Sequence, residues 1–186
     1  MKRQEEIDSN FNRVAKGNQD SIGPIKYIGH FMNDLYEYGS RCEGGHIVEI
    51  GVQGLLSSWS WLKSNPKKIT LNDINFNPCK EILPLYKSIA EENNIEVVVE
   101  QMNSHRMELA DVDLLFIDGL HQRPHVRKEL ELFNEVVSKY IIVHDIMKFK
   151  GVKDATDDFL STTDEWVVDK DIEIYPGLRI LKRINN

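Results

Sequence analysis

Two hydrophobic patterns alternate along most of this chain. Short, nearly continuous apolar runs occupy residues 46–51, 68–74, 95–101, 113–118 and 140–145. Runs of this kind are typical of buried strands. Longer stretches carry an apolar residue every three or four positions, and they occupy residues 24–38, 55–64, 80–93 and 124–139. This spacing predicts helices with one buried face.

Strands that alternate with helices predict a parallel sheet covered on both sides. The end of the sequence differs, because after a predicted helix at 153–161 strand-like runs flank the turn signal Pro176-Gly177. We therefore expect an α/β fold with a Rossmann-like, doubly wound, mostly parallel sheet and an antiparallel terminal strand. Residues 24–186 are expected to form this single domain, preceded by a flexible N-terminal segment, residues 1–23.

The composition is that of one folded domain, and the net charge limits the classes of partner that the protein could bind. The chain has 186 residues, of which 41% are hydrophobic and 28% charged, as in soluble globular proteins. Its net charge of −7 argues against nucleic acid as a partner, because phosphate binding needs clustered Lys and Arg. We find no signal peptide or membrane-spanning run, and two cysteines, Cys42 and Cys79, do not suggest a disulfide framework. We expect a cytoplasmic protein.

Candidate ligand-binding residues follow the first predicted strand, in 49-EIGVQG-54. In open α/β sheets, ligands bind beyond the carboxyl ends of the strands. Gly51 and Gly54 allow a tight turn and close approach of a ligand to the backbone. The segment is not the GxGxxG motif of dinucleotide sites, and Glu49 suits a cationic ligand group better than a pyrophosphate. An ordinary strand-to-helix turn explains the glycines about equally well.

Polar residues also follow the second and third predicted strands. Asp73 can accept hydrogen bonds from ribose hydroxyls, and Asn103 and Ser104 can hydrogen-bond to the edge of a base. Each residue alone is common in turns and caps. Together, a glycine turn, an acid and an amide at three strand ends are the layout of a nucleoside site.

At these residues the sequence resembles the class I S-adenosylmethionine-dependent methyltransferases. More narrowly, it looks like the O-methyltransferase group that includes macrocin-type sugar methyltransferases and cephalosporin-hydroxylase-like proteins. The segments that carry this narrower resemblance are 114-LLFIDGLH-121, 126-VRKELELF-133, 141-IIVHDI-146 and 176-PGLRILKR-183.

The resemblance implies a seven-stranded sheet, S-adenosylmethionine as cofactor and methyl transfer to a hydroxyl of a small, sugar-like acceptor. It implies that Glu49 and Gly51 flank the methionine part of the cofactor. Asp73 would hold the ribose, Asn103 and Ser104 would face the adenine, and Asp118 would lie beside the sulfonium and the acceptor. A monomer and a homodimer are both compatible with the sequence.

One departure from the family pattern concerns the glycine turn. The family often has a further glycine where this chain has Gln53 or Leu55. This departure favours an alternative, a catalytically inactive cofactor- or partner-binding module on the same fold. A nicotinamide-dependent oxidoreductase shares the acid after the second strand but requires the missing GxGxxG motif.

Two predicted strands end in an Asp with a His nearby, in 115-LFIDGLHQRPH-125 and 140-YIIVHDIM-147. Three roles remain open for these residues. Asp118 and Asp145 could ligate Mg²⁺, which prefers oxygen ligands. His121 or His144 could act as a general base on the acceptor hydroxyl, oriented by a neighbouring aspartate. The third role is structural, with His144 and Asp145 capping turns.

Charged residues begin the predicted helix at 124–139. Arg123, His125, Arg127 and Lys128 could hold an anionic group of the acceptor. The simpler interpretation is a solvated helix face with Glu129 and Glu131 as counter-charges. We expect His30, His46 and His105 to be ordinary surface or loop residues.

Overall fold

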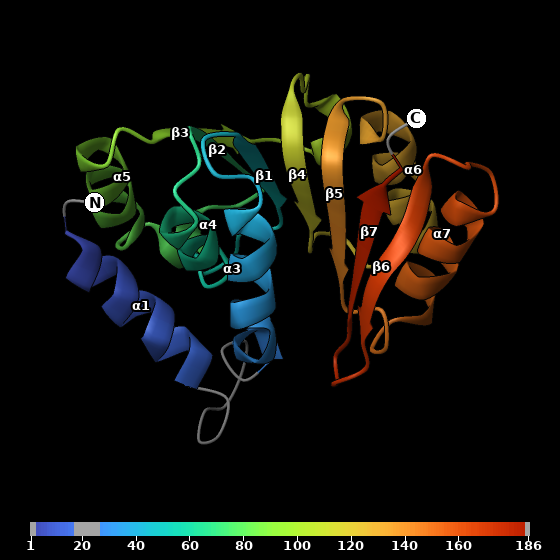
Figure 1. Ribbon diagram of the computed structural model, residues 1–186, viewed down its shortest axis with the longest axis horizontal. Coiled ribbons are helices and arrows are strands. Elements are labelled where there is room, and N and C mark those ends of the chain that lie inside the picture. Colours follow the sequence, from blue (N-terminus) through green and yellow to red (C-terminus); the bar gives the residue numbers. More distant parts are fainter. Residues whose placement is uncertain (1–2, 17–26, 185–186) are drawn as a thin grey trace.

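A seven-stranded sheet forms the centre of the computed structural model, which describes residues 3–16 and 27–184 (Figure 1). Its strands stand in the order β3-β2-β1-β4-β5-β7-β6, and all neighbours are parallel except where β7 pairs with β5 and β6. The strands are β1 (His46–Ile50), β2 (Lys68–Asp73), β3 (Glu96–Gln101), β4 (Val112–Ile117), β5 (Val137–His144), β6 (Trp166–Ile172) and β7 (Leu178–Arg183). The expected fold class and the antiparallel terminal strand are confirmed.

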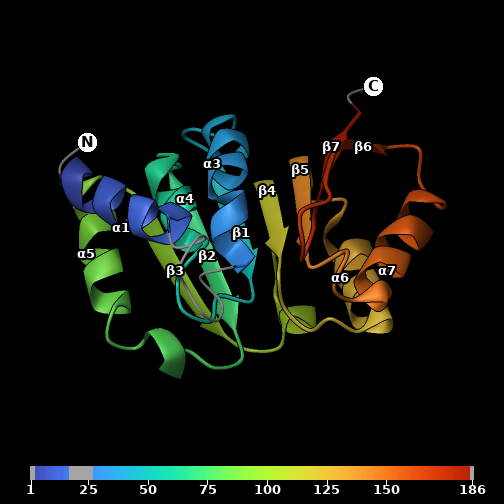
Figure 2. The same ribbon diagram turned by 90° about the horizontal axis from the view of Figure 1, so that it is seen from below.

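Helices cover both faces of the sheet. They are α1 (Gln4–Lys16), α3 (Met32–Ser40), α4 (Ser58–Lys63), α5 (Leu83–Glu92), α6 (Arg123–Phe133) and α7 (Lys150–Leu160). Among the described residues there are also short 3-10 helices at Gly29–Phe31, Asn77–Cys79 and Ser104–Arg106. In Figures 1 and 2, α1, α3, α4 and α5 lie around the first half of the sheet, whereas α6 and α7 pack beside each other around the second half.

Two hydrophobic cores follow from the alternation of side chains along the strands. In β4, Leu114 and Phe116 belong to the core under α1, α3, α4 and α5. Leu115 and Ile117 belong to the core under α6 and α7. The continuous apolar run that predicted β4 therefore fills both cores, as expected for a strand buried on two faces.

The N-terminal part of the chain differs from the expected flexible segment. Residues 4–16 form α1, and Ile7, Phe11 and Val14 are buried in the first core. Their spacing of four and three residues gives the helix one apolar face, whose burial outweighs the polar character of the rest. Residues 17–23 of the expected segment lie outside the described residues.

Several predicted helix boundaries were wrong: α5 begins at Leu83 and α7 at Lys150, rather than at residues 80 and 153. Helix α6 ends at Phe133, and residues 137–139, expected at the end of that helix, begin β5 instead. Helix α4 begins only at Ser58, because the preceding residues form the turn that connects it to β1. No helix among the described residues combines the length and the apolar character needed to cross a membrane.

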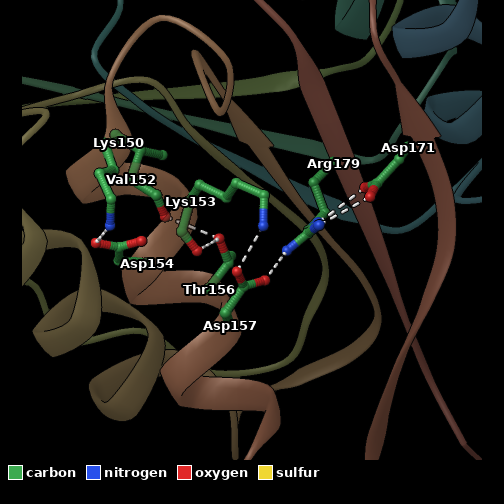
Figure 3. A network of polar contacts seen from close by, with 8 residues as sticks. All are labelled: Lys150, Val152, Lys153, Asp154, Thr156, Asp157, Asp171 and Arg179. Atoms are coloured by element: carbon green, nitrogen blue, oxygen red, sulfur yellow. Dashed lines mark hydrogen bonds and ion pairs between the residues drawn. The ribbon is translucent and has the colours of Figure 1, made fainter.

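A charged network joins the last two strands to α7 (Figure 3). The guanidinium of Arg179 on β7 donates two hydrogen bonds of 2.8 Å to Asp171 on β6 and one of 2.5 Å to Asp157 on α7. Arg179 itself is buried, and these contacts use all three of its side-chain nitrogens as donors. The exposed Lys153 approaches Asp157 from the outside. The network thus fixes the outer edge of the sheet against its covering helix.

Candidate functional site

A cavity of about 700 Å³ opens at the carboxyl ends of β1 to β5. It spans the point between β1 and β4 where the strand order reverses, the position at which α/β sheets bind ligands. The predicted site residues that line it are Gly51, Gly54, Asp73, Asn103, Ser104, Asp118, His121, His144 and Asp145. Glu49 is not among its lining residues.

Gly51 brings β1 into direct contact with the end of β4. Its φ of +87° lies in the region that favours glycine, and a Cβ built on it would stand 2.1 Å from the carbonyl oxygen of Asp118. No larger residue fits there without displacing Asp118. Gly54, in contrast, has only the side chain of Leu56 within 4 Å of such a Cβ. The close backbone approach inferred from sequence therefore belongs to Gly51.

The turn after Gly51 contains two residues in the left-handed region. Gln53 has a φ of +46° and Leu55 a φ of +58°. These are the two positions at which the resembled family often has another glycine. Each non-glycine residue in this region costs about 1 kcal/mol. The sequence departure is thus accommodated by strain in the turn, while the turn itself is kept.

Glu49 forms hydrogen bonds with residues at the start of α4, which follows the glycine turn. It is fully buried and accepts hydrogen bonds from the hydroxyls of Ser57 and Ser58 and, at 3.0 Å, from the indole nitrogen of Trp61. Burial raises the pKa of Glu49 to about 8. Both of its oxygens are engaged by protein donors, so Glu49 positions the first turn of α4. Its contact with the methionine part of the cofactor stays a prediction.

Asp73 closes the same turn from the other side. Its Oδ2 accepts hydrogen bonds from the backbone nitrogens of Val52 and Gln53, at 2.9 and 3.0 Å. Its Oδ1 accepts one from the backbone of Asn75, at 2.9 Å. The carboxylate lines the cavity while it holds the glycine turn in place. One residue thereby links the ends of β1 and β2.

The residues after β3 form the next part of the wall. The side chain of Asn103 accepts a hydrogen bond from the backbone of His105 and caps the short helix that follows. The hydroxyl of Ser104 is buried and donates to Oε1 of Glu129 on α6 at 2.6 Å. Burial raises the pKa of Glu129 to about 7. This part of the cavity therefore offers a backbone turn, a hydroxyl and a buried carboxyl group.

The partly exposed Asp118 pairs with the buried His144 at the ends of β4 and β5. The Nδ1 nitrogen of His144 donates to Oδ1 of Asp118 at 2.9 Å, and Phe31 packs edge-on against the imidazole. Burial would lower the pKa of His144, but the charge and hydrogen bond of Asp118 and the charge of Asp145 together outweigh it and raise that pKa. In turn, burial would raise the pKa of Asp118, but His144 and His121 hold it below its ordinary value. Both shifts favour the charged forms of the two side chains.

His121 joins the two aspartates. Its Nε2 lies 2.9 Å from Oδ2 of Asp145 and 3.5 Å from Oδ1 of Asp118. Its ring stacks on Phe149 with a centroid distance of 4.3 Å. Burial would lower its pKa, but the hydrogen bonds to both aspartates raise it to about 9. The four residues of the two Asp–His motifs thus meet at one point, as expected from sequence.

The expected Mg²⁺ site fits this arrangement poorly. Asp118, His121 and Asp145 each place one donor atom within 4.8 Å of the others, which is close enough to share an ion. Mg²⁺, however, prefers oxygen ligands and water, whereas here an imidazolium lies between the carboxylates and neutralises them. Magnesium at Asp118 and Asp145 would have to displace His121, and it stays a prediction.

Further lining residues were not predicted as part of the site, among them Glu129 near Ser104 and Tyr27, Leu120 and Lys148 near the Asp–His residues. His125, expected only as one of the residues that could hold an anionic group of the acceptor, lines the cavity near Ser104. Glu129 is fully buried rather than a solvated counter-charge. The expected solvated face is found for Arg123 and Arg127, which pair with Asp158 and Glu131. The four-residue spacing of His125 and Glu129, which puts both on one face of α6, was the available signal.

Solved structures of methyltransferases share this fold. The O-methyltransferase TomG from Streptomyces achromogenes, solved with SAM, is 13% identical, and the match covers 100% of both chains with a TM-score of 0.66. An O-methyltransferase from Bacillus cereus, solved with SAH, is 12% identical over 97% of this chain and 91% of its own, with a TM-score of 0.65. A methyltransferase from Geobacter sulfurreducens is 13% identical over 97% of this chain and 90% of its own, with a TM-score of 0.65.

Sequence comparison adds no closer relative. No protein-family model matches the chain, and no curated protein matches it. At identities of 12 and 13%, the structural likeness shows the fold alone. The resemblance seen in the strand-end motifs therefore agrees with the neighbours in architecture: the chain has the class I methyltransferase fold.

Proposed function

We propose that this protein is an S-adenosylmethionine-dependent methyltransferase that acts on a hydroxyl group of a small acceptor. The observation that carries the proposal is the continuity of the cavity. A single lining joins Gly51, Asp73 and Asn103, at the ends of β1 to β3, to the Asp–His residues at the ends of β4 and β5. A nucleoside cofactor and an acceptor hydroxyl would therefore be neighbours in one cavity.

The residues present fit the cofactor. Gly51 leaves the backbone of the first turn uncovered, and Asp73 places a carboxylate on the cavity wall where ribose hydroxyls could donate to it. Asn103 and Ser104 would lie along the base. When bound, the cofactor supplies an activated methyl group. The protein's own residues would hold the two reactants in line and remove the proton from the acceptor hydroxyl.

We assign His121 as the general base that takes the proton from the acceptor hydroxyl. It is the more exposed of the two histidines, and its Nε2 faces the carboxylates that would stabilise its charge after proton transfer. His144 is buried and holds Asp118 in place, so it acts as a positioning residue. Because the pKa of His121 is raised to about 9, little of the neutral form is present at pH 7. The rate of transfer should therefore rise with pH up to about 9.

Cofactor binding is the first test. Titration calorimetry with S-adenosylhomocysteine should show one binding site on the wild-type protein. Asp73→Asn should weaken binding by about 10-fold to 100-fold, the value of one or two hydrogen bonds to a charged group. Asp111→Asn is the matched control, since Asp111 is exposed, lies outside the cavity lining and has a positive φ that Asn tolerates. No binding heat with the wild-type protein would refute the proposal.

Methyl transfer is the second test. Wild-type protein and His121→Gln should be assayed with a panel of sugars, phenols and hydroxy acids across pH 6 to 10. His121→Gln should bind S-adenosylhomocysteine like the wild type but lose the rise of rate with pH. Binding with no transfer to any acceptor in the panel would favour the alternative, an inactive binding module on the same fold.

A further inference from the structure

A second group of metal-type ligands lies apart from Asp118, His121 and Asp145. It consists of His105, after β3, and His125 and Glu129 on α6. One donor atom from each side chain lies within 4.8 Å of the others. His125 and Glu129 are four residues apart on the helix and therefore project from the same face. The group joins the segment after β3 to α6.

The distances within this group suit a tetrahedral transition-metal ion. Zinc bonds to histidine nitrogen and carboxylate oxygen at about 2.0 Å, so two ligands of a tetrahedral site stand about 3.3 Å apart. The Nε2 nitrogen of His125 lies 3.2 Å from Oε1 of Glu129. The hydroxyl of Ser104 lies 3.3 Å from the same nitrogen. Two imidazoles and one carboxylate are also a ligand set that zinc uses in open sites.

A second observation points to a ligand here. Glu129 is fully buried, and its Oε2 has no hydrogen-bond partner among the described residues. Leaving a carboxyl oxygen buried and unsatisfied is costly, and a bound cation would remove that cost. Oε1 accepts the hydrogen bond from Ser104 and keeps a second lone pair, so either oxygen of Glu129 can ligate an ion.

The two histidine rings are oriented by contacts with each other and with the backbone of α6. Their rings stack with a centroid distance of 4.0 Å and an interplanar angle of 23°. The backbone carbonyl of His125 contacts Nε2 of His105 at 3.2 Å, a contact that orients the ring in the way that ligand histidines are commonly oriented. Both histidines are partly exposed, so an ion can enter.

We infer that His105, His125 and Glu129 form a binding site for a divalent transition-metal ion of the zinc class. The ion would fasten the segment after β3 to α6, beside Ser104. This role is independent of methyl transfer, and the ion takes no part in that reaction.

The test uses Co²⁺ and Zn²⁺ on the full-length protein. Wild-type protein should bind one equivalent of Co²⁺ at this site and show the visible absorption of tetrahedral cobalt, and Zn²⁺ should displace it. His105→Gln and Glu129→Gln should each weaken binding by more than about 100-fold, the upper value for loss of a supporting residue. Asp145→Asn is the matched control, since Asp145 belongs to the other candidate group.

Each outcome decides the inference. Loss of the cobalt band in His105→Gln and Glu129→Gln, with retention in Asp145→Asn, supports it. Absence of binding by the wild type overturns it, and so does retention in His105→Gln. Loss in all three variants also counts against it, because this site does not need Asp145. Circular dichroism checks that the variants are folded, and Glu129→Gln can still accept the hydrogen bond from Ser104.

Discussion

At the scale of single residues, Gly51 carries the strongest steric constraint in the site. Alanine at this position would combine a φ of +87° with a Cβ 2.1 Å from the Asp118 carbonyl oxygen. We expect Gly51→Ala to lower the free energy of unfolding by about 3 kcal/mol or more, the sum of backbone strain and overlap. Denaturant unfolding measures this change.

Gly44 provides the control for Gly51. It also has a positive φ, +71°, but a Cβ there would meet nothing within 4 Å. Gly44→Ala should therefore cost only the backbone strain, about 1 to 2 kcal/mol. Equal losses in the two variants would show that contact with Asp118 is unimportant.

Sequence reasoning at this scale succeeded where residue type and strand position acted together. Asp118 and Asp145 follow apolar strands, so their meeting at one edge of the sheet followed from the fold. Glu49 shows the limit, because it also lies at a strand end but points into a cluster of donors from α4. The burial of Glu129 was missed because a helix pattern of mixed charge does not tell which charged residue is buried.

At the scale of secondary-structure elements, the Arg179 network makes a prediction about the edge of the sheet (Figure 3). Arg179→Ala removes the contacts of β7 with β6 and α7 while Asp157 and Asp171, both partly exposed, regain water. We expect a loss of about 2 kcal/mol in the free energy of unfolding. Thermal or denaturant unfolding measures it.

Lys153 is the matched control for Arg179. It contacts the same Asp157 but is half exposed, so Lys153→Ala should cost less than about 0.5 kcal/mol. A loss as large as that of Arg179→Ala would mean that the charge near Asp157 matters and the bidentate contact with Asp171 does not.

The order and type of the elements could be predicted from the sequence better than their ends. The two periods of apolar residues identified the alternating strands and helices, and the Pro-Gly turn identified the final antiparallel pair. The predicted helix at 124–139 extended into β5 because Val137 fits both the helical and the strand spacing of apolar residues. In the structure Val137 pairs with Val112 of β4 and belongs to the strand. Residues 4–16 were predicted to be flexible because most of them are polar. Three buried apolar residues on one face make this segment a helix instead.

At the scale of the whole molecule, protons bound in the folded state set the pH dependence of stability. Burial raises the pKa of Glu49 to about 8 and that of Glu129 to about 7, from an ordinary value of 4.5. The aspartates raise that of His121 from 6.5 to about 9. Between these ordinary and folded values the folded state binds more protons than the unfolded chain. The free energy of unfolding should therefore fall as pH rises from about 5 to about 9.

Asp118 contributes to the pH dependence of the free energy of unfolding only at acidic pH. Its pKa is lowered, so the stability that it contributes is present above 3.8 and is lost as pH falls through its folded value. Denaturant unfolding at pH 5.5, 7 and 8.5 measures the profile. Glu49→Gln should flatten it, whereas substitution of the exposed Glu81 by Gln should not. A wild-type profile that is level or rises with pH would contradict this account.

The position of β7 between β5 and β6 has a consequence for protein synthesis. Strand β6 is translated first, yet among the described residues its only neighbour in the sheet is β7, which follows it. While a nascent chain has reached only β6, that strand has no partner, and β5, which ends at His144, still has one open edge. The Asp–His residues can therefore be fully enclosed only after residues 178–183 have left the ribosome, so cotranslational assembly of the site is completed by the end of the domain.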